Sequence, residues 1–131
     1  MRRSLSAFVA LFGAVCVLIS LAHIVLGPGS VPGSIPGNTV MDSEDRFYAT
    51  LFTGFGLALI WASRDLAARR GVFHALLATF FLGGLARIAS VIAVGWPGPM
   101  FTVLGSLELI LPPGLWVWRR QAFGSGDGIR T

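Results

Sequence analysis

The residues of this chain best suited to chemistry are Arg87 and Glu108, because each carries a charge inside a long apolar segment. A charge at the centre of a membrane helix costs about 2.5 to 3.5 kcal/mol on insertion scales, so it normally faces protein, water or an opposite charge. The two segments are consecutive, and both residues lie about 10 to 12 Å from the turn between them at the helical rise per residue. This spacing predicts an ion pair between adjacent antiparallel helices.

Two prolines follow Glu108 by one helical turn. Pro112 and Pro113 have no N–H, so the carbonyls of Glu108 and Leu109 lose their usual helical donors. We therefore expect a kinked helix with free backbone acceptors beside the Glu108 carboxylate.

Other polar residues lie at similar depth in the first two apolar segments. Ser20 and His23 are near the end of the first segment, and Arg46 is near the start of the second. The expected site is a polar pocket in the outer half of a bundle, with binding residues Arg87, Glu108, Arg46, His23 and Ser20. Two interpretations stay open. The pair is either a structural contact that fixes helix register, with His23 and Arg46 simply interfacial, or a site for a ligand or proton.

The composition indicates that these residues belong to a membrane protein. The chain has 131 residues, of which 54% are hydrophobic and 12% charged, and its mean hydropathy is +0.76. These values predict an all-α integral membrane protein that forms a four-helix bundle in one domain over residues 1–131. We expect helices at about 5–26, 43–63, 72–94 and 100–118, each long enough to span a bilayer.

The remaining segments are rich in turn residues. Residues 27–42 form an outer loop in which Pro-Gly occurs three times, and the loop is either a flexible spacer or a lid. Asp42 and Ser43 are candidate N-caps for the second helix. The polar, glycine-rich tail at 122–131 is expected to be disordered.

Small residues mark the faces by which these helices would pack. Ser6, Gly13, Ser20 and Gly27 recur every seven residues on the first helix. On the third helix the corresponding face contains Arg87 and excludes Phe80, Phe81 and Leu85; its members are Ala75, Thr79, Gly83, Arg87 and Ser90. Membrane helices approach one another through such faces.

Arginines predict the topology. All ten basic residues are arginines, and most lie on one side of a four-span model: Arg2, Arg3, Arg64, Arg69, Arg70, Arg119 and Arg120. The positive-inside rule then places both termini in the cytoplasm of a bacterial cell, with the chain in the inner membrane. The net charge of +4 does not indicate nucleic-acid binding, because the basic residues are not interleaved with exposed aromatics.

The usual catalytic and cofactor motifs are not found in the sequence. Cys16 is the single cysteine, and His23 and His74 do not have metal-ligand spacing. No serine has a histidine and an acid in evident register, and no glycine-rich phosphate loop occurs. We therefore expect no catalytic residues, no metal and no cofactor.

Three stretches resemble one family of membrane proteins. They are Asp45–Leu57, Gly83–Ser90 with Gly95 and Pro97 after it, and Leu107–Leu109, and they resemble the small bacterial four-helix membrane proteins of domain of unknown function 4345. The resemblance implies a four-helix membrane bundle, distantly similar to DoxX-like proteins, with characteristic polar positions at Arg46, Arg87 and Glu108. It implies no activity.

The favoured function is a noncatalytic membrane protein that binds a lipophilic molecule or a membrane protein partner in the polar pocket. The alternatives are a proton-coupled transporter component with Glu108 as the carrier, and a membrane enzyme acting on a lipid or quinone. The glycines at Gly54, Gly56, Gly83 and Gly84 suit packing within the bundle or between copies, so a homo-oligomer stays open.

Overall fold

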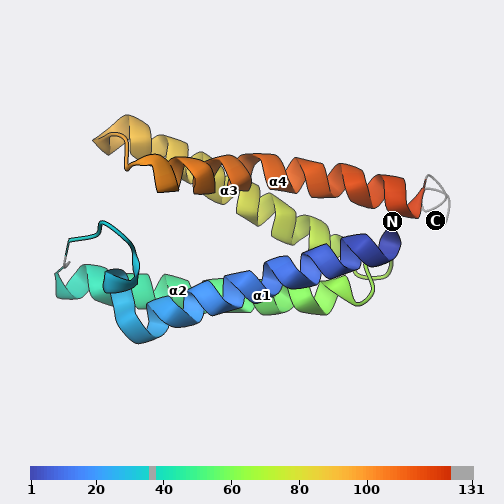
Figure 1. Cartoon of the computed structure of the whole chain (residues 1–131), viewed down its shortest axis with the longest axis horizontal. Helices are drawn as coiled ribbons and strands as arrows, with labels where there is room; N and C mark the ends of the chain where they lie inside the picture. The colour runs from blue at the N-terminus through green and yellow to red at the C-terminus, as the bar shows by residue number, and fades with distance from the viewer. Residues whose placement is uncertain (36–37, 125–131) are drawn as a thin grey trace. The chain divides into compact units, whose positions relative to one another are not determined.

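The computed structural model describes residues 1–35 and 38–124, and within them the chain has four long helices and no strand. The elements are α1 (Arg2–Leu26), the short 3-10 helix η1 (Gly27–Ser30), α2 (Thr39–Ser63), α3 (Arg70–Val94) and α4 (Pro99–Phe123) (Figure 1). The prediction of four helices is confirmed. The last residues of α1, α2 and α3, which are Leu26, Ser63 and Val94, are the predicted ones, and each of these helices begins two to four residues earlier than predicted. Residues 125–131 of the predicted tail lie outside the described residues.

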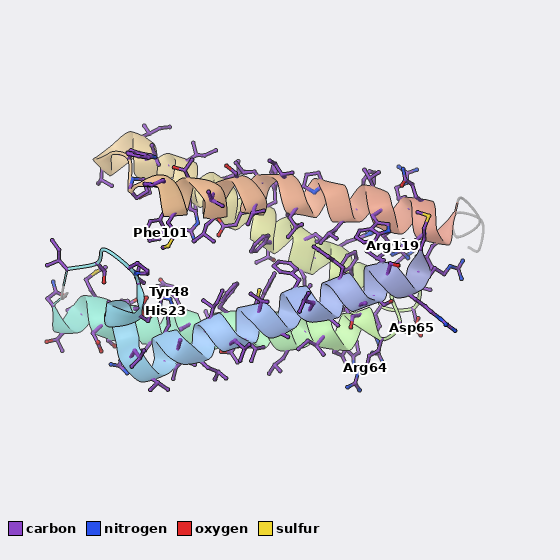
Figure 2. The ribbon with its side chains drawn as sticks, in the orientation of Figure 1. His23, Tyr48, Arg64, Asp65, Phe101 and Arg119 are labelled. Carbon is purple, nitrogen blue, oxygen red and sulfur yellow. The ribbon has the colours of Figure 1, made fainter. Side chains whose placement is uncertain are left out.

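The chain divides into two compact units, each described by itself below. The first hairpin is Ser6–Asp65, in which α1 lies beside α2, and the second hairpin is Leu66–Thr131 together with Met1–Leu5, in which α3 lies beside α4 (Figure 1). In the first hairpin, His23 and Tyr48 lie at one end and Arg64 and Asp65 at the other (Figure 2).

Helix α2 begins earlier than predicted because a different residue caps it. Asn38 has an extended backbone (φ −72°, ψ 170°), and its side-chain oxygen accepts a hydrogen bond from the Met41 N–H at 2.9 Å. The predicted caps, Asp42 and Ser43, are therefore wrong. Asp42 lies in the first turn of α2, where a carboxylate is favourable near the helix N-terminus.

Helix α4 continues to Phe123, past the predicted end at Trp118. Arg2 donates from Nε to the Ala122 carbonyl at 3.0 Å, and its guanidinium lies 4.6 Å from the Phe123 ring centroid. The buried Arg119 donates from Nε to the Leu66 carbonyl at 3.1 Å. These contacts accompany the last turns of α4, and Ala122 and Phe123, which were predicted to belong to the tail, are helical.

Three of the helical segments are long and apolar enough to cross a membrane: Arg2–Ser30, Arg70–Val94 and Pro99–Phe123. Large apolar side chains on them are exposed, among them Leu18 at 67%, Ile92 at 81% and Ile110 at 69%. Soluble monomers rarely expose extended apolar surface, whereas a bilayer requires it. Helix α2 is equally long but more polar, because its first turns carry Asp42, Glu44, Asp45 and Arg46. A fourth span and cytoplasmic termini stay predictions.

Helices α1 and α2 of the first hairpin approach each other closely at two glycines. A Cβ atom added to Gly13 would lie 2.6 Å from the Gly56 carbonyl oxygen, and one added to Gly56 would lie 2.6 Å from the Gly13 carbonyl oxygen. Further along the same face, the Ser20 Oγ lies 2.6 Å from the Thr53 Oγ1. The small-residue face predicted for α1 is therefore confirmed at Gly13 and Ser20.

We expect Gly13→Ala and Gly56→Ala each to lower the free energy of unfolding by about 1 to 3 kcal/mol, because each methyl group meets a backbone atom that cannot move alone. Gly54→Ala is the matched control, since nothing lies within 4 Å of its added Cβ and alanine favours the helix. Unfolding by sodium dodecyl sulfate in mixed micelles, followed by circular dichroism, measures the difference. Equal effects of all three substitutions would contradict this close approach.

Candidate functional site

Arg87 and Glu108 form the predicted ion pair between α3 and α4. The Arg87 Nε donates to the Glu108 Oε2 at 2.6 Å, a charge-assisted hydrogen bond. The Glu108 side chain is 12% exposed and that of Arg87 is 42% exposed. The Glu108 side chain is thus largely enclosed, while part of the Arg87 side chain can be reached from outside the hairpin.

Small residues on both helices make room for this pair. A Cβ added to Gly84, one turn before Arg87, would lie 3.1 Å from the Glu108 Cβ and 2.9 Å from the Leu109 side chain. One added to Gly105 would lie 3.6 Å from the Arg87 Cδ. The Arg87 guanidinium also lies 5.9 Å from the ring centroid of Phe101, near the start of α4 (Figure 2). The pair therefore lies in a close helix contact with an aromatic ring at its edge.

The face of α3 that meets α4 differs from the predicted one. Gly84 makes the close contact, whereas nothing lies within 4 Å of a Cβ added to Gly83. Leu77 and Phe81 line a hollow together with residues of α4, so Phe81 shares the interhelical side from which it had been excluded. The stripe Leu77, Phe81, Gly84 follows the helical period, and the long Arg87 side chain reaches Glu108 from its flank.

The two prolines lie within α4, which continues unbroken through them. Because Pro112 and Pro113 have no N–H, the carbonyls of Glu108 and Leu109 have no helical donor. Backbone acceptors therefore accompany the carboxylate in the same turn of α4. A kink at this point stays a prediction.

In the first hairpin, His23 has an acidic partner that the sequence analysis missed. Its Nδ1 lies 3.0 Å from the Asp45 Oδ2 and 3.2 Å from the Oδ1. Asp45 precedes Arg46 near the start of α2, opposite the end of α1. Since α1 and α2 are consecutive and antiparallel, residues near the end of α1 are expected to lie beside residues near the start of α2. This relation could have revealed the contact between His23 and Asp45.

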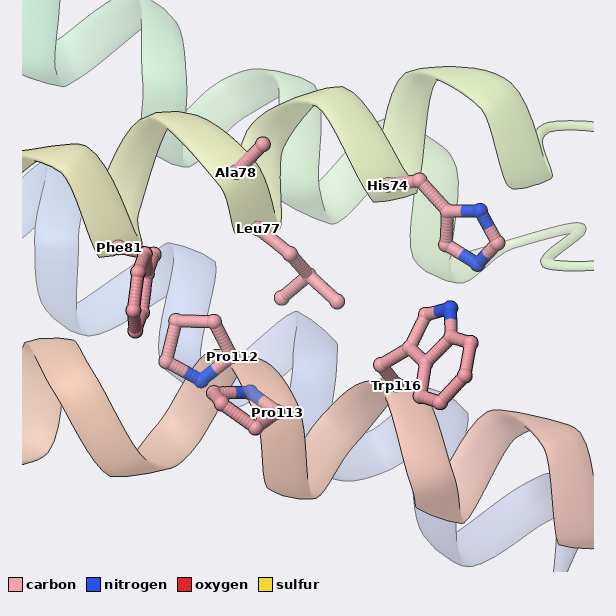
Figure 3. A pocket seen from close by; sticks show the side chains of 7 residues that line it. All are labelled: His74, Leu77, Ala78, Phe81, Pro112, Pro113 and Trp116. Carbon is pink, nitrogen blue, oxygen red and sulfur yellow. The ribbon is translucent and has the colours of Figure 1, made fainter.

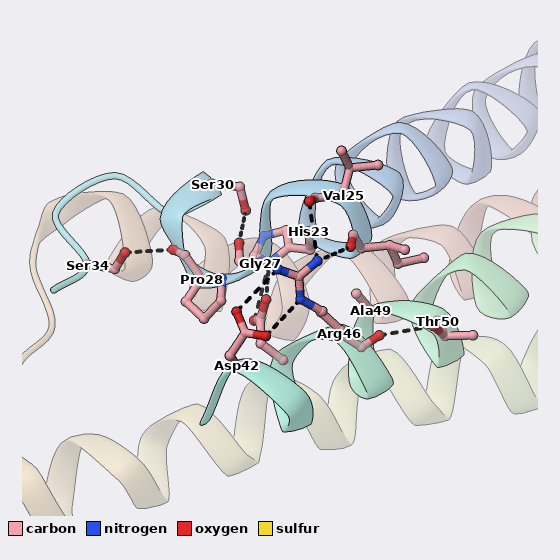
Figure 4. Close-up of polar contacts among 12 residues, drawn as sticks. His23, Val25, Gly27, Pro28, Ser30, Ser34, Asp42, Arg46, Ala49 and Thr50 are labelled. Carbon is pink, nitrogen blue, oxygen red and sulfur yellow. Dashed lines mark hydrogen bonds and ion pairs between the residues drawn. The ribbon is translucent and has the colours of Figure 1, made fainter. Parts of the chain in front are cut away.

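Arg46 binds the C-terminal end of α1 (Figure 4). Its Nη1 donates to the Ile24 carbonyl at 2.7 Å and to the Val25 carbonyl at 3.2 Å, and its Nε donates to the Asp42 carboxylate at 2.9 Å. The last carbonyls of a helix have no intrahelical donor, and a basic side chain there supplies one. Gly27 (φ +66°) turns the chain at this point, where an added Cβ would lie 2.7 Å from Asp42 Oδ1.

The five predicted binding residues thus fall into two groups. Ser20, His23 and Arg46 belong to the first hairpin, and each has a hydrogen-bond partner there. Arg87 and Glu108 belong to the second hairpin and bind each other. A single pocket formed by all five stays a prediction. Among the described residues, no cluster of histidine, cysteine, aspartate and glutamate could hold a metal ion.

A double-mutant cycle on Arg87→Gln and Glu108→Gln should give a coupling energy of about 0.5 to 3 kcal/mol, because either single change leaves a charge without its partner. Combining Arg87→Gln with Ser106→Ala is the control, since the Ser106 hydroxyl donates to the Thr102 carbonyl of its own helix. Unfolding in mixed micelles measures both cycles. Coupling no larger than the control would contradict a pair that contributes to stability.

The Arg46 hydrogen bond lowers the pKa of the Asp42 carboxyl below its ordinary value of 3.8. A depressed carboxyl pKa stabilises the folded hairpin above pH 3.8, and that contribution is lost as the pH falls through the folded pKa. We expect Arg46→Gln to raise the Asp42 pKa toward 3.8 in a carboxyl carbon NMR titration. Arg64→Gln, at the other end of the hairpin, should leave it unchanged. An Asp42 pKa that is the same in all three proteins would contradict the contact.

Comparison with known proteins places the chain in a family. No curated protein and no solved structure matches it. The family model described as Domain of unknown function (DUF4345) matches residues 4–119, which include α2, α3, most of α1 and α4, and both polar groups described above. Because this match covers most of the sequence, the chain belongs to the DUF4345 family.

Proposed function

We propose that this chain is a noncatalytic multi-pass protein of the bacterial inner membrane, with both termini cytoplasmic. It binds a lipophilic molecule, or a membrane protein partner, at the polar site around Arg87 and Glu108. The site lies in the half of the bundle that faces away from the cytoplasm.

The observation that carries the proposal is the 2.6 Å pair between Arg87 and Glu108 on two helices that are apolar enough to span a membrane. Charged residues within membrane-spanning helices are costly and commonly belong to binding sites or transport paths. Two further features support binding. The Arg87 side chain is 42% exposed, and two carbonyls without helical donors lie in the turn of Glu108. A lipophilic molecule with one polar group, such as a carbonyl or hydroxyl, could bind there while its apolar part lies along the exposed faces of α3 and α4.

Native mass spectrometry with lipid extraction tests the proposal on the detergent-purified chain. We expect the wild type to retain a defined small molecule, and Arg87→Ala and Glu108→Gln to lose it with unchanged helical circular dichroism. Ser106→Ala, on the same turn of α4 but outside the pair, is the control and should retain the molecule.

The opposite outcome would be equally clear. If the three variants retain the same molecules as the wild type, the pair is structural and the proposal fails. Proton flux in liposomes that disappears in Glu108→Gln while no molecule is retained would instead favour a proton-coupled transporter component.

A further inference from the structure

The hollow lined by Leu77 and Phe81 lies between α3 and α4, at the end of the hairpin away from Phe101. It measures about 370 Å³, near the lower end of the range of small-molecule sites. Its lining is mostly apolar, with a histidine and a tryptophan at one end: His74, Leu77, Ala78, Phe81, Pro112, Pro113 and Trp116 (Figure 3). The proposed function uses only the effect of the two prolines on the Glu108 and Leu109 carbonyls, and none of the other side chains.

Polar atoms gather at one end of this groove. The His74 Nε2 is buried and has no hydrogen-bond partner among the described residues. The indole nitrogen of Trp116 points toward the imidazole across the groove (Figure 3). A buried polar atom without a partner is costly, so a ligand oxygen at this place would stabilise the site.

A second hollow lies beside this groove, at the end of α4. Trp116 lines both, and the second hollow of about 310 Å³ is also lined by Val117, Arg120, Gln121 and Gly124. The exposed Arg120 places its guanidinium 4.8 Å from the Trp116 ring centroid. A cation over a ring face keeps its N–H donors for other acceptors, and a guanidinium suits phosphate.

Charge at this end of the second hairpin is positive. Its described residues include arginines near the start of α1, the start of α3 and the end of α4: Arg2, Arg3, Arg69, Arg70, Arg119 and Arg120. Its only acid among the described residues is Glu108, three turns from Arg120 and already bound to Arg87. An anion is therefore the complementary ligand.

We infer that this groove binds an anionic phospholipid. The phosphate binds at Arg120, a glycerol or ester oxygen binds the His74 Nε2, and an acyl chain lies along Leu77, Phe81 and the two prolines. The groove runs from His74 to Phe81, about 10 Å along α3, which suits part of an acyl chain. A partner helix is about 10 to 12 Å wide and does not fit such a hollow. Basic pockets between membrane helices are known to bind anionic lipid headgroups.

Titration of the delipidated full-length chain with phosphatidylglycerol or phosphatidylcholine, read by native mass spectrometry, tests the inference. We expect tighter binding of phosphatidylglycerol. Arg120→Gln should lower phosphatidylglycerol affinity about fivefold, as expected for one arginine near a lipid phosphate. It should lower phosphatidylcholine affinity less, because the choline cation of that lipid already offsets the charge of its phosphate. Arg64→Gln is the matched control, because it removes an exposed arginine of the first hairpin and should have no effect.

A second variant tests the groove itself. Trp116→Ala removes the wall shared by both hollows and should weaken binding of both lipids, whereas Trp96→Ala, the same truncation at the other end of the hairpin, should not. Equal affinity for the two lipids, or equal losses in Arg120→Gln and Arg64→Gln, would overturn the inference. Displacement of phosphatidylglycerol by inorganic phosphate would also overturn it, because the ligand would then be a free anion.

Discussion

Helices with apolar surfaces leave few places for a charge, and this constraint shapes both hairpins. In the second hairpin the enclosed Glu108 is neutralised by Arg87 across the α3–α4 contact. In the first hairpin the acids Asp42 and Asp45 are held by Arg46 and His23 near the end of α1. The helices themselves pack closely where glycine occurs, because a residue without a side chain allows the neighbouring helix to approach at Gly13, Gly56 and Gly84.

The two groups of polar residues differ in what they leave available. Arg46 uses its donors on Asp42 and on the last carbonyls of α1, so most of its hydrogen-bonding capacity is committed within the hairpin. Arg87 makes one hydrogen bond to Glu108 and is partly exposed, which leaves donors directed elsewhere. This difference is why the proposed binding site is centred on Arg87 and Glu108, with Arg46 in a supporting position.

Much of this architecture could be predicted from the sequence, because charge and proline are rare in its apolar segments. The last residues of α1, α2 and α3 could be predicted from the apolar segments of the sequence. The pair of Arg87 with Glu108 could be predicted because both residues lie at the same distance from the turn between their helices. The face of α3 could not be read reliably, since Gly83 and Gly84 are adjacent and one residue is about 100° of helix rotation. The cap by Asn38 and the contact of His23 with Asp45 could not be predicted, because both depend on the conformation of the loop between α1 and α2. The His74 groove depends on how two prolines and a tryptophan pack, which has no sequence signature.

The contact between Arg2 and the Ala122 carbonyl joins residues 120 positions apart. During synthesis the first of these residues leaves the ribosome long before the second is made, at rates of about 5 to 20 residues per second. The start of α1 therefore cannot contact Ala122 and Phe123 until α4 has been synthesised. Docking of the start of α1 onto the end of α4 is accordingly a late step, whereas the first hairpin can assemble while the rest of the chain is still emerging.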